Sequence, residues 1–352
     1  MTASPQVLNK FGRVLVTGGS GYFGSLLIDS LVPDTNRIRV LDVLDADDRP
    51  AEIEFQLGDI RDPAACGRAC QETDVVFHCV AQVPLMKTKA ECLDVNANGT
   101  RVLLDAALQA GVRKVVYISS SAVYGVPQSV PITEETIPHP AEDYGEAKLA
   151  GEGICREFAE RGLDITIIRP RTILGHGRLG IMQIVFEWVR EGSNVFVLGR
   201  GDNKYQFVHA DDLARACIKA AARPGFALYN VGAAEFGTMR ETLEGLIAHA
   251  GTKSRVRSLP YALAVRGMQW TSRLGLSPLA PYHWLAYGRD VYFDISKAQS
   301  ELEWNPIHSN IEMFIESYEW YLTNRDKILS QGDRSVHRSA VKQGVLKLLR
   351  WL

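Results

Sequence analysis

Tyr144 and Lys148 stand four residues apart in the stretch YGEAK, whose composition is typical of a helix. Side chains at positions i and i+4 of a helix share one face, with their Cβ atoms about 5–6 Å apart. A surface pair, in which the phenol ring lies against the lysine stem, explains this spacing without any chemistry. The alternative is a phenol that acts as an acid or base because a nearby ammonium lowers its pKa from about 10 toward neutrality.

A glycine-rich turn follows the first apolar run of the chain. RVLVT (13–17) leads into GGSGYFG, and SLLIDSLV then carries apolar residues at helical spacing. This order predicts a strand, a turn and a helix. Gly18, Gly21 and Gly24 would permit a tight turn, close approach of the backbone to a pyrophosphate, and close helix–strand packing. An ordinary tight turn is the alternative.

Asp42 ends the second predicted strand, RIRVLD. A carboxylate at that place accepts hydrogen bonds from the adenosine ribose hydroxyls and repels a 2′-phosphate, which favours NAD over NADP. A solvated strand end is the alternative interpretation.

Further apolar runs predict strands at 53–59, 74–81, 114–121 and 164–170, and the stretches NANGTRVLLDAALQAG and YGEAK are predicted to be helical. Strands that alternate with helices indicate a doubly wound parallel sheet, in which ligands bind beyond the carboxyl ends of the strands. The polar and small residues expected on that rim are Gly18, Asp42, Asp59, Ala81 and Ser119 to Ser121.

The bulk composition excludes several classes of protein. Of 352 residues, 46% are hydrophobic and 23% charged, which indicates a globular chain of one large or two modest domains. A net charge of −2 gives no field that would favour nucleic acid as a partner. The six cysteines form no C-x-x-C pair or His/Cys cluster with zinc-site spacing, so we predict no metal and reduced cytosolic thiols. No secretory signal or membrane-spanning run is apparent.

The order of the motifs resembles that of the extended short-chain dehydrogenases/reductases, also called the NAD-dependent epimerase/dehydratase family. The resemblance covers about residues 12–306 and rests on TGGSGYFG, Asp42, GDIRD, HCVA, VNANGT, YISSSAVYG, YGEAK, RPRTILG, FVHADDLA and YFDISKAQSELEWNP. It implies an α/β fold, a Rossmann-type doubly wound parallel sheet with a smaller C-terminal substrate-binding lobe. The expected divisions are an NAD-binding domain at 1–170, an interleaved lobe at 171–325 and a tail at 326–352. A homodimer through the helices near 90–110 and 142–160 is also implied.

The resemblance assigns roles to individual residues, with NAD as the cofactor. Tyr144 would be the catalytic acid/base, Lys148 its partner and a ligand of the nicotinamide ribose, and Ser120 the hydroxyl that orients the substrate oxygen. The implied cofactor contacts are Gly18, Gly21, Tyr22, Phe23, Gly24, Asp42, Asp59, Ile60, Val80, Ala81, Asn96, Ser119, Tyr144, Lys148 and Pro170. Helix capping by Asn96 and strand termination by Pro170 are the alternatives for those two.

Departures from the family pattern reduce the number of reactions that this chain is expected to catalyse. Sugar-nucleotide 4,6-dehydratases of this family carry an acidic pair where this chain has Ser121 and Ala122, which argues against that activity. Epimerases usually carry an asparagine and an arginine where this chain has Thr172 and Tyr205. The substrate contacts that we predict are Ser121, Arg171, Thr172, Arg178, Lys204, Tyr205 and Arg289. Surface solvation is the alternative for the four basic residues among them.

Three functions follow from these observations. The leading hypothesis is an epimerase of a nucleotide-activated sugar, most simply at C4, working through a transient keto sugar. The second is a dehydrogenase of an apolar alcohol or ketone that resembles 3β-hydroxysteroid dehydrogenase. The third, from another class, is an NAD-binding regulator without catalysis, which the intact Ser120, Tyr144 and Lys148 set argues against.

The tail from Arg334 carries five Arg/Lys and no acid, with apolar residues at helical spacing and Trp351 beside them. A basic amphipathic helix of this kind can lie on an anionic membrane surface. Docking on its own domain or on a partner subunit are the alternatives. We therefore predict a cytoplasmic location. If the tail binds lipid, the protein would also associate peripherally with the inner membrane surface.

Overall fold

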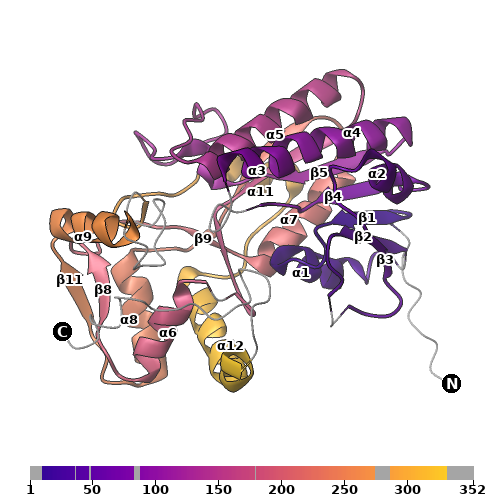
Figure 1. The fold of residues 1–352 in the computed structure, drawn as a ribbon. Coiled ribbons are helices and arrows are strands. Elements are labelled where there is room, and N and C mark those ends of the chain that lie inside the picture. The colour runs from indigo at the N-terminus through magenta and orange to yellow at the C-terminus, as the bar shows by residue number, and fades with distance from the viewer. Residues whose placement is uncertain are drawn as a thin grey trace.

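The chain folds into a parallel β-sheet between two helical layers, with a smaller lobe beside it (Figure 1). This computed structural model describes residues 10–35, 37–46, 49–82, 88–178, 180–273 and 286–330. The sheet has seven strands in the order β10-β6-β5-β4-β1-β2-β3, and every neighbouring pair is parallel. The strand bounds are β1 (Val14–Thr17), β2 (Ile38–Asp42), β3 (Glu54–Leu57), β4 (Val75–His78), β5 (Lys114–Ile118), β6 (Ile165–Pro170) and β10 (Ala227–Val231).

The central strands are continuous apolar runs because both of their faces are covered. In β1, Leu15 belongs to one core cluster, whereas Val14 and Val16 belong to the other. Successive side chains of a strand point to opposite faces, so the two clusters mark the two faces of the sheet. Helices α1 (Tyr22–Leu31) and α7 (Ala210–Ala222) contribute to the cluster of Val14 and Val16. Helices α2 (Pro63–Cys70), α4 (Gly99–Gln109) and α5 (Asp143–Glu160) contribute to the other.

The smaller lobe is built from two short parallel strand pairs and several helices (Figure 1). The pairs are β7 (Thr172–Leu174) with β9 (Phe207–His209) and β8 (Val195–Leu198) with β11 (Val256–Leu259). The helices are α6 (Met182–Arg190), α8 (Met239–Ala250), α9 (Tyr261–Arg273) and α12 (Asn310–Ser330), while α11 (Ser296–Leu302) lies against β10. The predicted fold class is confirmed. The domain limits remain predictions, although β10 and α7 show that segments after residue 170 return to the sheet.

The strand order reverses at β1, which lies between β2 and β4. Ligands of open α/β sheets bind in the crevice at such a reversal, beyond the carboxyl ends of the strands. Short helices border this crevice: α3 (Lys89–Leu93), the π-helical turn Asp94–Asn98 and the 3₁₀ turn Ser121–Tyr124.

No helix within the described ranges is long and apolar enough to cross a membrane. The amphipathic segment predicted from Arg334 lies outside the described residues, so its contact with membrane or protein stays a prediction, as does the homodimer.

Candidate active site

A cleft of about 810 Å³ opens at the carboxyl ends of the strands, where the sheet order reverses. It gathers most of the residues singled out in the sequence, from segments between 18 and 178. Those that line it are Gly18, Gly21, Tyr22, Phe23, Gly24, Asp42, Asp59, Ile60, Val80, Ala81, Ser119, Ser120, Ser121, Tyr144, Lys148, Pro170, Arg171, Thr172 and Arg178.

Two glycines of the turn after β1, Gly18 and Gly24, have no room for a side chain. Gly18 has φ +72°, and a Cβ there would lie 2.9 Å from the backbone nitrogen of Val80. A Cβ on Gly24 would lie 2.2 Å from the carbonyl oxygen of Gly18. Gly21 caps the N-terminus of α1 without a side-chain hydrogen bond. Bare backbone at a helix N-terminus fits the pyrophosphate of a dinucleotide.

Asp42 lies at the end of β2 and borders the same turn. Its Oδ2 accepts a hydrogen bond from the backbone of Ser20 at 3.0 Å, and its Oδ1 accepts one from Val43 at 2.7 Å. Burial raises the pKa of this carboxyl, and the backbone hydrogen bonds oppose that shift. A carboxylate in this place suits the hydroxyls of an adenosine ribose, so the turn and Asp42 together fit NAD.

Lys148 is buried on α5 and is held by backbone carbonyls. Its Nζ donates hydrogen bonds to the oxygens of Ile118 at 2.8 Å and Val80 at 3.4 Å, and it lies 5.0 Å from the ring centroid of Tyr117. Burial lowers its pKa to about 8, because desolvation disfavours the ammonium. Lys148 therefore fastens α5 to the end of β5 and to the loop that follows β4.

The pKa of Tyr144 depends mainly on burial in the protein alone. Burial raises it to about 12, while a hydrogen bond with Ser120 and the charge of Arg178 act in the lowering direction. Desolvation outweighs these groups in the protein alone, so the lowering of the phenol pKa expected from Lys148 together with a cationic nicotinamide stays a prediction. Ser120 and Arg178 are the groups that favour the tyrosinate here.

The three consecutive serines have different surroundings. Ser120 Oγ accepts a hydrogen bond from the backbone of Ala122 at 3.1 Å and bonds with Tyr144. Ser119 Oγ instead donates to Glu152 Oε1 at 2.6 Å, in the interior. Ser121 is buried at the start of the 3₁₀ turn. The register that places Ser120 beside the phenol thus agrees with the geometry.

A buried ionic network behind the serines was not predicted. Arg169 donates to Glu152 through Nε at 2.8 Å and Nη2 at 2.5 Å, and through Nη1 to the hydroxyl of Tyr124 at 2.6 Å. Glu152 and Arg169 are both at most 1% exposed. The signal in the sequence was an arginine inside the apolar strand DITIIRP, which requires a buried partner.

Glu142 is a second residue that sequence reasoning missed. It lines the cleft two residues before Tyr144, and its charge raises the pKa of that phenol. Burial, followed by repulsion from Asp143, raises the pKa of Glu142 itself. An acid just before the YGEAK stretch was the available signal.

Four predicted residues do not reach the cleft wall. Asn96 lies behind it, where its amide bonds to both backbone groups of Gln82, at 2.8 and 2.9 Å. Lys204 and Arg289 are exposed away from the cleft. Tyr205 is fully buried, and its hydroxyl lies 3.2 Å from Thr172 Oγ1, so it touches the cleft only through that residue.

Comparisons with known proteins agree with this architecture. The NAD dependent epimerase/dehydratase family matches residues 14–232. Protein y4nG of Sinorhizobium fredii, described as uncharacterized, is 54% identical over 95% of this chain and 85% of its own length. A 3-beta-hydroxysteroid dehydrogenase of Mycolicibacterium neoaurum is 28% identical over 96% of this chain and 99% of its own length.

A solved structure of similar fold is UDP-glucose 4-epimerase of Thermotoga maritima with UDP-glucose. It is 25% identical to this chain, with a TM-score of 0.75, over 89% of this chain and 99% of that one. The family match covers more than half of the chain, and the glycine turn, Asp42 and the rim residues fit the family's cofactor. The chain therefore belongs to the NAD-dependent epimerase/dehydratase family of enzymes and uses NAD as its cofactor.

Proposed function

We propose that this enzyme acts on a nucleotide-activated sugar, most simply as a C4 epimerase. The observation that carries the proposal is Arg171 at the cleft wall. Its side chain is 2% exposed, Nε donates to the carbonyl oxygen of Gln206 at 3.1 Å, and Nη2 has no hydrogen-bond partner within the described residues. The guanidinium lies 4.9 and 5.4 Å from the ring centroids of Tyr205 and Phe293, so a bound anion would satisfy the costly unpaired donor once the side chain turns toward the cleft.

A second cation borders the same cleft. The guanidinium of Arg178 lies 5.0 Å from the ring centroid of Tyr22, in the turn that fits the dinucleotide. No carboxylate of the described chain forms an ion pair with it. Two arginines without acidic partners favour a substrate with a diphosphate over an uncharged one.

The residues of the chain have distinct parts in this proposal. Bound NAD would accept a hydride from the carbinol carbon and return it, with no net redox change. Tyr144 removes the hydroxyl proton as the hydride leaves and donates it when the hydride returns. Ser120 orients the substrate oxygen toward the phenol. Lys148 holds the end of β5 and the loop after β4 at the positions where cofactor and substrate meet.

A second candidate is a dehydrogenase of an apolar alcohol that resembles 3β-hydroxysteroid dehydrogenase. Tyr205 favours it, because epimerases of the family usually carry an arginine at that position. Here the side chain is buried, between the rings of Phe207 and Tyr287 at 4.9 and 5.0 Å. The mycolicibacterial relative of that name also aligns over nearly the whole chain.

One experiment separates the two candidates. Purified protein is incubated with UDP-, dTDP-, GDP- and CDP-sugars without added NAD, and separately with 3β-hydroxysteroids and NAD. The nucleotide-sugar proposal expects an epimeric product and no net NADH. Stoichiometric NADH with a steroid and no sugar turnover would contradict it and support the second candidate.

A further inference from the structure

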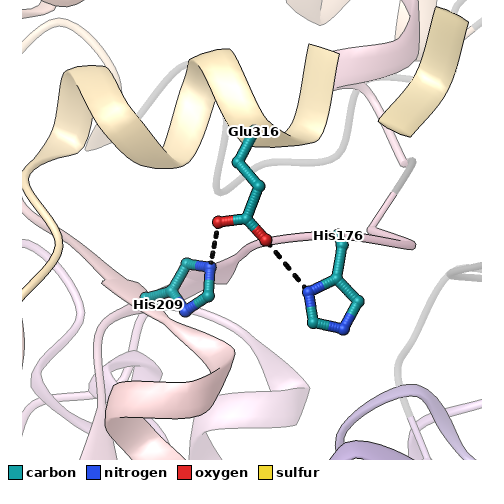
Figure 2. Close-up of side chains that lie close together, drawn as sticks. All are labelled: His176, His209 and Glu316. Atoms are coloured by element: carbon teal, nitrogen blue, oxygen red, sulfur yellow. Dashed lines mark hydrogen bonds and ion pairs between the residues drawn. The ribbon is translucent and has the colours of Figure 1, made fainter. Parts of the chain in front are cut away.

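Three side chains with metal-binding atoms meet outside the cleft, where α12 crosses the β7–β9 pair. His176 follows β7, His209 ends β9, and Glu316 lies on α12. Figure 2 shows the carboxylate of Glu316 between the two imidazole rings. Its Oε2 is 2.8 Å from His209 Nε2 and its Oε1 is 3.0 Å from His176 Nδ1. One donor atom from each residue lies within 4.8 Å of the others.

The surroundings hold this cluster in place. The ring of His308 stacks on the fully buried ring of His209, with centroids 3.8 Å apart. Ser317 on α12 bonds to both backbone groups of Gly175, at 3.1 and 3.3 Å, which fixes the segment after β7. A Cβ on Gly175 would lie 2.9 Å from His209 Nε2, so glycine leaves space at that donor atom.

One side of the cluster is open to solvent. The side chains of His176 and Glu316 are 38% and 37% exposed. A second cavity of about 300 Å³ is lined by His176 and Gly177, among others. An ion and the waters that complete its coordination have a path to the donor atoms from this side.

We propose that His176, His209 and Glu316 bind one Zn²⁺ ion, with water as the remaining ligand. Two imidazole nitrogens and a carboxylate oxygen are a donor set that zinc accepts in tetrahedral geometry. No metal was predicted from the sequence, because the ligands show no spacing motif. Glu316 follows His209 by 107 residues and His176 by 140 residues along the chain. Only the crossing of α12 over β7 and β9 brings them together.

Binding requires a change in the proton positions. Nδ1 of His209 accepts a hydrogen bond from the backbone of Asp211 at 3.2 Å, so Nε2 carries the ring proton and donates it to Glu316. Zn²⁺ would take Nε2 and the ring proton would move to Nδ1, which would then give up the hydrogen bond that it accepts from the backbone of Asp211. The carboxylate of Asp211, 3.8 Å from Nδ1, is the acceptor that it would then meet. A neutral His176 would bind zinc through Nδ1 with its ring proton on Nε2, whereas an imidazolium would release its Nδ1 proton to solvent.

The ion would tie the C-terminal helix to the wall of the cleft. β7 begins at Thr172, which lines the cleft, and the hydroxyl of Tyr22 donates to the carbonyl oxygen of His176 at 3.3 Å. Metal binding stabilises a fold when the site exists only in the folded state. Zinc should therefore raise the midpoint of thermal unfolding.

The test uses the full-length protein after treatment with a chelator. Zinc chloride is titrated into wild type, Glu316→Gln and His176→Ala by isothermal calorimetry, and thermal unfolding is followed with and without zinc. We expect one equivalent in wild type and an affinity at least about 100-fold lower in both variants. His249→Ala is the matched control: it removes a 2.8 Å pair between His249 on α8 and Glu319 on α12, the helix of Glu316, and should bind zinc like wild type.

Two results would overturn the proposal: wild type that binds no zinc, or equal binding by wild type and both cluster variants. Should a variant fail to fold, the zinc K-edge absorption spectrum of loaded wild type decides. Two imidazoles with oxygen ligands support the site. A shell with sulfur, or with fewer than two imidazoles, contradicts it.

Discussion

Lys148 Nζ donates a hydrogen bond of 2.8 Å to the carbonyl oxygen of Ile118, so that α5 is fastened to the end of the strand that leads into the serines. The ammonium is 1% exposed and its pKa is lowered to about 8 by burial. Lys148 thus positions the end of β5 at the cleft. It lowers the free energy of unfolding in doing so, because a charge is kept in the interior.

Lys148→Met should lower activity while stabilising the fold. Replacing a buried ion pair by apolar side chains of similar volume is often neutral or stabilising by about 1–4 kcal/mol, and we expect the same direction for this buried ammonium. Because the lowered pKa means that the unfolded chain binds this proton more tightly, the wild-type free energy of unfolding should rise between pH about 8 and 10.5. Urea unfolding across this range should show that rise in wild type and not in the variant. Lys89→Met, at an exposed lysine, is the control, and a variant less stable than wild type at pH 7 would contradict the argument.

Glu142→Gln should move the pH profile of substrate oxidation to lower pH. The carboxylate raises the pKa of Tyr144, so its removal lowers that pKa and makes the base form available in more acidic solution. The pH dependence of kcat/KM measures this shift. Glu146→Gln, which removes an acid on the same helix that pairs with Lys89 at 2.5 Å, should leave the profile in place. A shift to higher pH would show that Glu142 acts in another way.

Glu152→Ala should destabilise the protein by about 3–5 kcal/mol, because it leaves the guanidinium of Arg169 buried without its partner. Denaturant unfolding measures the loss. Glu157→Ala on the same helix removes an exposed pair with Arg101 and should cost no more than about 1 kcal/mol. Similar losses in the two variants would mean that the buried network contributes little.

Asp42→Ser should reduce the preference for NAD over NADP by about tenfold or more, because the carboxylate that repels a 2′-phosphate is gone. The ratio of the two dissociation constants is the measurement. Asp45→Ala, at an exposed acid paired with Arg49 outside the cleft, serves as control. An unchanged ratio would place cofactor selection elsewhere.

Most of the sheet could be predicted because its strands are buried on both faces. Runs such as KVVYI, which forms β5, have no polar face and appear in the sequence as continuous apolar stretches. The glycine turn and Asp42 could be placed because the turn directly follows β1 and Asp42 is the last residue of β2. Helix α2, PAACGRAC, was not predicted, since its apolar face is made of small residues and cysteines.

The limits of prediction lay where contacts join distant segments. Tyr205 was expected at the substrate, but its backbone pairs with Val291 just before β9 and its side chain is fully buried. The partners of Arg169 could not be chosen from the sequence, because Glu152 is one of many acids at helical positions. The phenol pKa depends on burial, which spacing along a helix does not reveal.

The central claim is that the phenol of Tyr144 transfers the substrate proton in the cleft. The direct test is kcat/KM of Tyr144→Phe on the substrate that the nucleotide-sugar and steroid panel identifies, with NAD affinity measured in parallel. The loss of a general acid/base predicts a fall of at least about 100-fold with NAD binding unchanged. A variant that keeps NAD affinity and turns over within a few-fold of wild type would show that another group carries the proton.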